Sequence, residues 1–124
     1  MSRPDPRLQG LDYLLDLDRE TYEIGGGWWV TIRASRVPVS EERPHGIQYA
    51  LSLHSPRGKR VVGYDNAHAP HKRGPLKLVG VKGTTLDHRH YRDHWSSYDF
   101  KSPADLLEDF WRDVEKILKE AGVQ

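Results

Sequence analysis

Two stretches of the chain, residues 28–35 and 47–54, alternate strictly between apolar and polar or mixed positions. The apolar positions are Trp28, Val30, Ile32 and Ala34 in the first stretch and Ile47, Tyr49, Leu51 and Leu53 in the second. A period of two gives a strand one apolar face, so the pattern predicts two half-buried β-strands. Residues 55–58, Ser-Pro-Arg-Gly, have the composition of a tight turn. Residues 59–64 are therefore predicted to return as a third strand, making residues 47–64 a hairpin.

The C-terminal stretch has a different period. Ser102 is a suitable N-cap, Pro103 falls at the first helical position, and Asp105 falls at the capping-box position. Apolar residues then recur at three- and four-residue spacing. They are Leu106, Leu107, Phe110, Trp111, Val114, Ile117 and Leu118. This pattern predicts an amphipathic helix that ends near Gly122 and packs against the sheet.

The other segments are less decisive. Residues 1–10 are polar and Pro-rich and are expected to be frayed, and the leucines of residues 11–17 fit a short helix or an extended element equally. Gly25–Gly27 is interpreted as a hinge. Residues 76–81 resemble a fourth strand, and residues 87–94 are expected to be irregular. The predicted fold is a single α+β domain over residues 1–124: an antiparallel sheet of three to five strands with the C-terminal amphipathic helix on one face.

Composition narrows the possible chemistry. The chain has 124 residues, a formal net charge of +1 and no cysteine. The lack of cysteine excludes disulfides, thiolate catalysis and Cys-containing zinc sites. The N-terminal residues contain no apolar run typical of a signal peptide, and no stretch is long enough to span a membrane. We therefore expect a cytoplasmic protein without a membrane association.

Histidines are concentrated between residues 61 and 94, among lysines and arginines. Five of the seven histidines lie there: His68, His71, His88, His90 and His94. Imidazole exchanges protons near neutral pH, and guanidinium groups bind phosphate oxygens. A lone histidine of this kind usually belongs to a solvated loop, whereas the cluster suits phosphodiester chemistry or phosphate binding.

A metal-independent endoribonuclease is the first functional hypothesis. His88 and His90 would share a face if their segment is extended, and His68 or His71 would carry a second proton. Arginines would bind the phosphate, and aromatic residues such as Trp95 and Tyr98 would stack an unpaired base. The candidate catalytic residues are His88, His90, His71, Arg89 and Asp65. The candidate nucleic-acid-binding residues are Arg92, Tyr91, Lys72 and Arg73.

Three alternatives remain open. In the first, the basic middle of the chain is a non-enzymatic surface that binds nucleic acid or a protein. His88 and His90 with Asp87, Asp65 or His71 also have the ligand types of a divalent-metal site, although no HExxH-like spacing is present; otherwise no cofactor is expected. Asp65 and Asn66 are as well suited to local backbone hydrogen bonds at a strand end as to a site.

Residues Val62-Gly63-Tyr64-Asp65-Asn66-Ala67, followed by clustered histidines and Asp87-His88-Arg89-His90, resemble the TumE-like toxin–antitoxin family. The resemblance covers about residues 61–118. Asp87 stands where that family's second cluster has its first histidine, the gap before this cluster is longer, and His68 precedes the Pro/His pair. The resemblance implies a growth-inhibiting toxin that a partner antitoxin neutralises. It does not settle the target; RNA is the target that the clustered histidines and arginines suggest.

Overall fold

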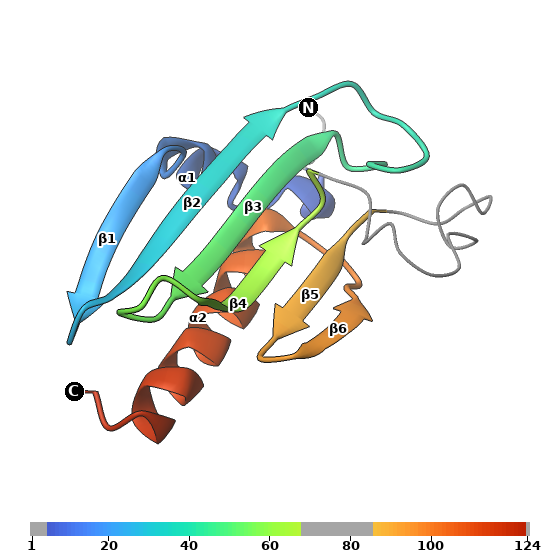
Figure 1. The fold of residues 1–124 in the computed structure, drawn as a ribbon. Helices are drawn as coiled ribbons and strands as arrows, with labels where there is room; N and C mark the ends of the chain where they lie inside the picture. Colours follow the sequence, from blue (N-terminus) through green and yellow to red (C-terminus); the bar gives the residue numbers. More distant parts are fainter. Residues whose placement is uncertain (1–4, 68–85, 124) are drawn as a thin grey trace.

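The computed structural model describes residues 5–67 and 86–123. Within these ranges an antiparallel sheet has six strands in the order β1-β2-β3-β4-β5-β6 (Figure 1). The strands are β1 (Glu20–Gly25), β2 (Trp28–Arg36), β3 (Ile47–His54), β4 (Arg60–Asp65), β5 (His88–Tyr91) and β6 (His94–Ser97). The helices are η1 (Pro6–Leu8, a 3-10 turn), α1 (Leu11–Asp16) and α2 (Pro103–Glu120). The α+β class is confirmed, but the predicted count of three to five strands was too low.

The strand count was too low because β1, β5 and β6 were not predicted. Residues 87–94 were expected to be irregular, yet His88–Tyr91 pairs with β4, and the chain turns back to form β6. Strand β1 was also missed; its best-buried side chains, Tyr22 and Ile24, are only half-buried. Strands β5 and β6 lack a run of alternating apolar side chains, β1 has only Tyr22 and Ile24, and all three are held by pairing with a neighbouring strand. The possible strand at residues 76–81 lies outside the described residues.

The N-terminal part of the described chain packs against α2. The backbone carbonyl of Gln9 accepts a hydrogen bond from the Ala104 amide at 2.9 Å. Residues 1–10 were expected to be frayed, but this bond holds the described residues 5–10 against α2. Residues 11–16 take the helical alternative and bury Leu11 and Leu14. The Gly25–Gly27 run forms the β1–β2 turn, and all three residues have positive φ, which glycine adopts without strain.

The hydrophobic core lies between the sheet and the two α-helices, which lie together on one face of the sheet (Figure 1). Side chains from β2, β3 and β4 meet those of α2 there. The fully buried members include Val30, Ile32, Leu51, Leu53, Val62, Leu106, Phe110 and Ile117. The apolar positions of the predicted strands and helix are thus the core positions. No helix in the described ranges is long and apolar enough to cross a membrane.

The predicted start of α2 is confirmed in atomic detail. The Ser102 hydroxyl accepts a hydrogen bond from the Asp105 amide at 3.1 Å, and Pro103 follows the cap. We expect Ser102→Ala to lower the free energy of unfolding by about 1 kcal/mol, because the first-turn amide of Asp105 loses its acceptor. Urea denaturation measures this. The exposed Ser97→Ala on β6 is the control, and an equal loss in both variants would contradict the capping role.

Candidate functional site

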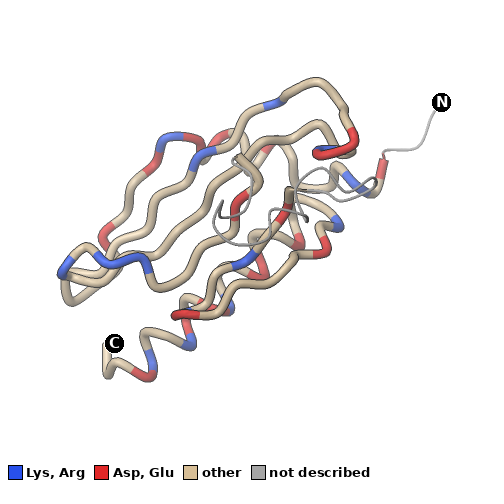
Figure 2. The backbone as a smooth tube through the Cα atoms, turned by 45° about the vertical axis from the view of Figure 1, so that its right-hand side comes forward, with Lys and Arg blue, Asp and Glu red and all other residues tan. Residues whose placement is uncertain are grey.

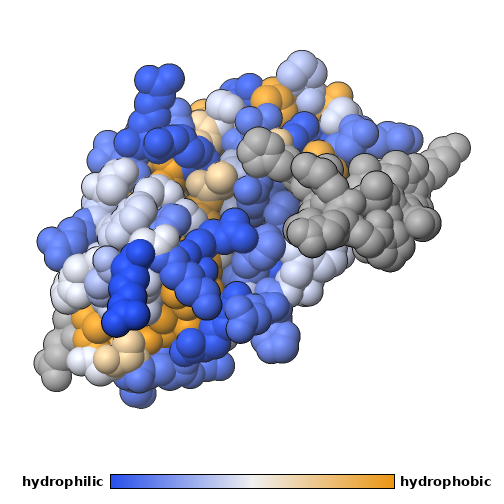
Figure 3. Space-filling model, viewed as in Figure 1, coloured by the Kyte–Doolittle hydropathy of each residue, from blue (hydrophilic) through white to orange (hydrophobic). Residues whose placement is uncertain are grey.

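The sheet has a second face, opposite α1 and α2, which we call the open face. Figure 3 views the molecule from this side, and its surface is largely hydrophilic. Strand register aligns Arg33, Ala50, Asp65 and His88 in one row across this face, from β2 to β5. A second row holds Thr31, Ser52, Gly63, His90 and Trp95. The open face therefore gathers two of the histidines with a carboxylate and an indole.

His88 and His90 lie on the open face as neighbours two residues apart on β5. Their ring centroids are 5.1 Å apart and the rings are nearly perpendicular. His88 is only 5% exposed, and its Nδ1 lies 2.8 Å from the Leu86 carbonyl. Because a carbonyl can only accept, Nδ1 carries a proton, which leaves Nε2 as the ring atom able to exchange a proton. Trp95 stacks on His88 from β6, with the centroids 6.0 Å apart.

Arg60 brings a cation to the same place. A Cβ on Gly63 would lie 3.1 Å from the Arg60 Cδ and 3.4 Å from its Nε, so the Arg60 side chain crosses directly over Gly63. Gly63 is paired with His90 on the adjacent strand. Only a residue without a side chain leaves room for this crossing. Arg60 was not among the predicted site residues, since its placement depends on the glycine three positions later.

The environment of His90 determines its protonation. Burial, together with repulsion from Arg60 and His88, lowers the pKa of His90 to about 4, while Asp65 acts in the opposite direction. His90 is therefore neutral at pH 7 and able to accept a proton. A bound phosphodiester would add negative charge beside the ring and raise this pKa toward neutrality.

Asp65 and Asn66 have different surroundings. The Asp65 carboxylate accepts a hydrogen bond from the Ala67 amide, which is the local strand-end bond considered from sequence, while its strand position opposite His88 keeps it on the open face. Asn66 is fully buried: it accepts from the Tyr49 amide at 2.8 Å and donates to the Ile47 carbonyl at 2.8 Å. Asn66 therefore ties the end of β4 to β3.

Asp87 is the centre of a buried polar cluster just before His88. Its Oδ2 accepts hydrogen bonds from the Tyr49 hydroxyl at 2.7 Å, from His45 Nε2 at 3.1 Å and from Asn66 Nδ2 at 3.4 Å. The opposite ring nitrogen of His45 accepts from the Ile47 amide, which places the His45 proton on Nε2. This cluster fixes the start of β5. His45 was not predicted, because nothing in its polar loop distinguishes it.

Arg89, Tyr91 and Arg92 lie away from the histidine pair. Arg89 points to the helix side, where its Nε donates to Asp113 at 2.8 Å and to the Tyr64 hydroxyl at 3.0 Å. The Tyr91 ring lies 4.8 Å from the Arg89 guanidinium carbon. Arg92 occupies the β5–β6 turn with positive φ and forms an ion pair with Glu120.

Alternation along β5 explains this division, since neighbouring residues of a strand face opposite sides. The Asp113 hydrogen bond raises the pKa of Arg89 above its ordinary value, so Arg89 is a stable cation on the helix side.

His71, Lys72 and Arg73, together with His68, lie outside the described residues. Tyr98 donates to Asp109 at 2.6 Å and so belongs to the helix side as well.

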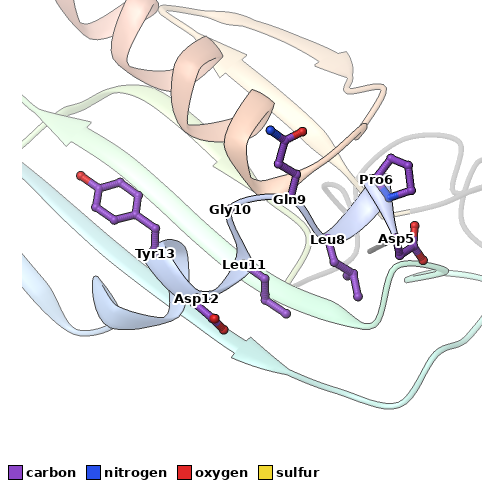
Figure 4. Close-up of a pocket in the computed structure, with 8 residues that line it drawn as sticks. All are labelled: Asp5, Pro6, Leu8, Gln9, Gly10, Leu11, Asp12 and Tyr13. Atoms are coloured by element: carbon purple, nitrogen blue, oxygen red, sulfur yellow. The ribbon is translucent and has the colours of Figure 1, made fainter. Parts of the chain in front are cut away.

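In residues 5–67 and 86–123, no three His, Asp or Glu side chains are arranged to hold a metal ion. A hollow of about 770 Å³ lies beside residues between Asp5 and Tyr13 (Figure 4). Its described lining has two carboxylates, Asp5 and Asp12, and none of the predicted site residues. We therefore build the candidate site from His88, His90, Arg60 and Asp65.

A protein-family model described as Toxin TumE matches residues 18–118. The chain belongs to the TumE toxin family. The match extends from before β1 to near the end of α2, so it includes strands that the resemblance over about residues 61–118 left out. No significant match was found among curated proteins or among solved structures.

The fold brings together the two motifs that carry the resemblance to the TumE family. Val62-Gly63-Tyr64-Asp65 lies on β4, Asp87-His88-Arg89-His90 enters β5, and these strands are hydrogen-bonded neighbours. Asp65 pairs with His88, and Gly63 pairs with His90. Residues distant in the sequence thus form one surface because β4 and β5 are paired.

The lowered pKa of His90 predicts a pH-dependent stability. The unfolded chain binds a proton on this residue below about pH 6.5, whereas the folded chain does so only below about 4, so stability falls as the pH is lowered through this window. After allowance for solvent around the half-buried ring, we expect His90 to contribute a loss of about 1–2 kcal/mol.

Urea unfolding of wild type and His90→Gln at pH 7 and at pH 4.5 measures this contribution. The variant is expected to lose less stability than the wild type on acidification. His94→Gln, on the exposed β6, is the control and is expected to follow the wild type. Identical pH dependence in all three proteins would contradict the lowered pKa.

Proposed function

We propose that this protein is a metal-independent endoribonuclease toxin that acts on cytoplasmic RNA and is neutralised by a partner antitoxin. The observation that carries the proposal is the pair His88 and His90 beside Arg60 on the open face. Membership in a toxin family supports the growth-inhibiting role. Two imidazoles next to a guanidinium supply the groups that RNA cleavage through the ribose 2′-OH requires.

In the proposed reaction, His90 accepts the proton of the 2′-OH, because its ring is neutral at pH 7. The 2′-oxygen forms a bond to phosphorus while the bond to the 5′-oxygen breaks. His88 must enter the reaction with protons on both ring nitrogens: it donates the Nε2 proton to that leaving oxygen, and its Nδ1–H stays bound to the Leu86 carbonyl. Arg60 stabilises the negative charge that develops on the phosphoryl oxygens. The products are a 2′,3′-cyclic phosphate and a 5′-hydroxyl, and His71 is the alternative proton donor.

A non-enzymatic RNA-binding toxin is the second candidate, and the burial of His88 favours it. A ring that is 5% exposed and held by the Leu86 carbonyl also fits a purely structural histidine. His90 and Arg60 would then be phosphate contacts without proton transfer. Under this alternative RNA stays intact during growth inhibition.

Induced expression in a bacterial host separates the two candidates. We expect growth arrest accompanied by fragments of total RNA, and the purified protein should release 2′,3′-cyclic phosphate ends equally well with and without EDTA. Arrest with intact RNA would favour the binding toxin. Cleavage abolished by EDTA would contradict the metal-independent mechanism, and normal growth with intact RNA would contradict both candidates.

A further inference from the structure

A second hollow opens on the open face, beyond the histidine pair. It has a volume of about 430 Å³ and lies between the α1–β1 turn and the strands β2 and β3. Its lining includes Arg19, Arg33, Gln48, Ala50 and Ala67. Binding sites for small ligands span about 300–1,000 Å³, so the hollow is large enough for one small organic group. None of the described residues that line it was predicted as a site residue.

The hollow is in line with the candidate catalytic residues. Arg33 pairs with Ala50, Ala50 with Asp65, and Asp65 with His88, so one row of the sheet connects the hollow to the histidines. Three strand spacings separate the ends of the row, which is roughly 14 Å. Of the two inner positions, Ala50 has a small side chain, and the Asp65 carboxylate accepts a hydrogen bond from the Ala67 amide. A short flexible polymer lying across the strands would contact both ends.

The charge of the hollow fits a polyanion. Arg33 is exposed, and the Arg19 side chain is 86% exposed. The only carboxylate in the described lining, Asp18, accepts a hydrogen bond from the Ala34 amide at 2.8 Å, and its other oxygen lies 4.0 Å from the Arg19 Nε. Asp18 is thus engaged with the backbone, and two guanidinium groups outweigh it. A third basic group, Arg43, donates to the carbonyls of Asn66 and Ala67 and so holds one wall of the hollow.

Further basic residues lie at the other end of β3 and β4 from the hollow. Arg57, Lys59 and Arg60 form a basic run at and after the β3–β4 turn (Figure 2). Arg60 crosses over Gly63, next to His90. The open face therefore has a cation beside the histidines and two more at the hollow, as a chain of phosphates would require.

We infer that the hollow binds a nucleotide of single-stranded RNA next to the one that is cleaved, with Arg33 and Arg19 on its phosphate. This inference rests on the proposed function and adds the substrate class and the direction of the RNA across the strands. A single strand is required because only an unpaired nucleotide can leave its stack and enter a hollow of this size. Duplex RNA keeps its bases stacked and paired and would contact the face only through its backbone.

Binding to an uncleavable probe tests the inference. The probe is a short, fluorescently labelled RNA of mixed sequence with 2′-O-methyl groups at every position, which removes the attacking 2′-OH. Fluorescence anisotropy would be measured against salt concentration for the wild type, Arg33→Gln and Arg19→Gln. Lys119→Gln, which removes an exposed cation from α2 on the other side of the sheet, is the matched control.

We expect each arginine variant to raise the Kd about threefold to tenfold and to reduce the slope of log K against log salt by about 0.7, the value for one phosphate contact with a single strand. Lys119→Gln should leave both quantities unchanged. A duplex of the same sequence should bind the wild type more weakly, and the arginine substitutions should alter its Kd less. The two arginine variants are independent exposed substitutions, so misfolding of one leaves the other as a test.

Cleavage assays on unmodified RNA separate the two proposals. If wild type, Arg33→Gln and Arg19→Gln bind the probe alike and cleave RNA alike, the hollow is not an RNA subsite while the nuclease proposal stands. If the wild type binds the probe through these arginines but never cleaves RNA, the subsite stands and the nuclease proposal fails. Failure of the wild type to bind single-stranded RNA overturns the inference.

Discussion

His90→Ala is expected to reduce RNA cleavage by about 10²- to 10⁴-fold, the usual contribution of a general base or acid. The reason is that His90 is the neutral imidazole on the open face, with Arg60 beside it to hold a phosphate. His90 is only half-buried, so its removal should leave the fold intact. The measurement is the rate of cyclic-phosphate formation on a single-stranded RNA by purified protein, with circular dichroism to check folding.

His94→Ala is the matched control, because it removes a histidine of the same hairpin that is exposed on β6. We expect it to cleave RNA at the wild-type rate. His88→Ala should also lose cleavage, although its buried ring requires that stability be measured alongside. A folded His90→Ala protein that cleaves at more than about a tenth of the wild-type rate would contradict the assigned role.

Asp87→Ala is expected to lower the free energy of unfolding by about 3 kcal/mol or more. The buried carboxylate is the shared acceptor for Tyr49, His45 and Asn66, and its removal leaves their donors without a partner in a dry environment. Domains of this kind have a total stability of only about 5–15 kcal/mol. The variant is therefore expected to unfold at a much lower urea concentration than the wild type.

Two control substitutions distinguish the contribution of the buried cluster to stability from the general effect of removing a carboxylate charge. Asp93→Ala removes a carboxylate whose side chain is 88% exposed, and we expect a change within about 0.5 kcal/mol. Asp87→Asn keeps one carbonyl acceptor and should fall between Asp87→Ala and the wild type. A loss below about 1 kcal/mol for Asp87→Ala would show that the cluster does not stabilise the start of β5.

The sequence predicted the elements whose signal is local. The alternation at residues 28–35 and 47–54, the turn at residues 55–58 and the cap at Ser102 lie within one strand, turn or helix, and β2, β3, β4 and α2 are found there. Strands β1, β5 and β6 were missed because they are held by hydrogen bonds to a neighbouring strand, which the pattern along their own residues does not reveal. On β5 a charged residue, Arg89, faces the helix, where an apolar residue would be expected from the alternating pattern. Its charge is accommodated there because it donates a hydrogen bond to Asp113.

The candidate site divides in the same way. A period of two on one strand was enough to place His88 and His90 on a common face. It was not enough to separate them from Arg89 and Tyr91, which the same period turns toward α2. Arg60 and Arg33 were not predicted as site residues. Arg60 reaches the site because it crosses over Gly63, which pairs with His90, and Arg33 joins it through the register of β2, β3, β4 and β5.

By itself, the sequence of this protein determined the α+β class, the hairpin, the C-terminal helix, the resemblance to a toxin family and the presence of adjacent histidines. These follow from residue type and spacing along one segment. Only the tertiary structure decided that β4 and β5 are neighbours, that Arg60 lies over Gly63 beside His90, that Asp87 is buried with His45, and that a basic hollow continues the same row of the sheet. Pairing between strands sets these contacts, and no spacing within a single segment encodes which strands will pair.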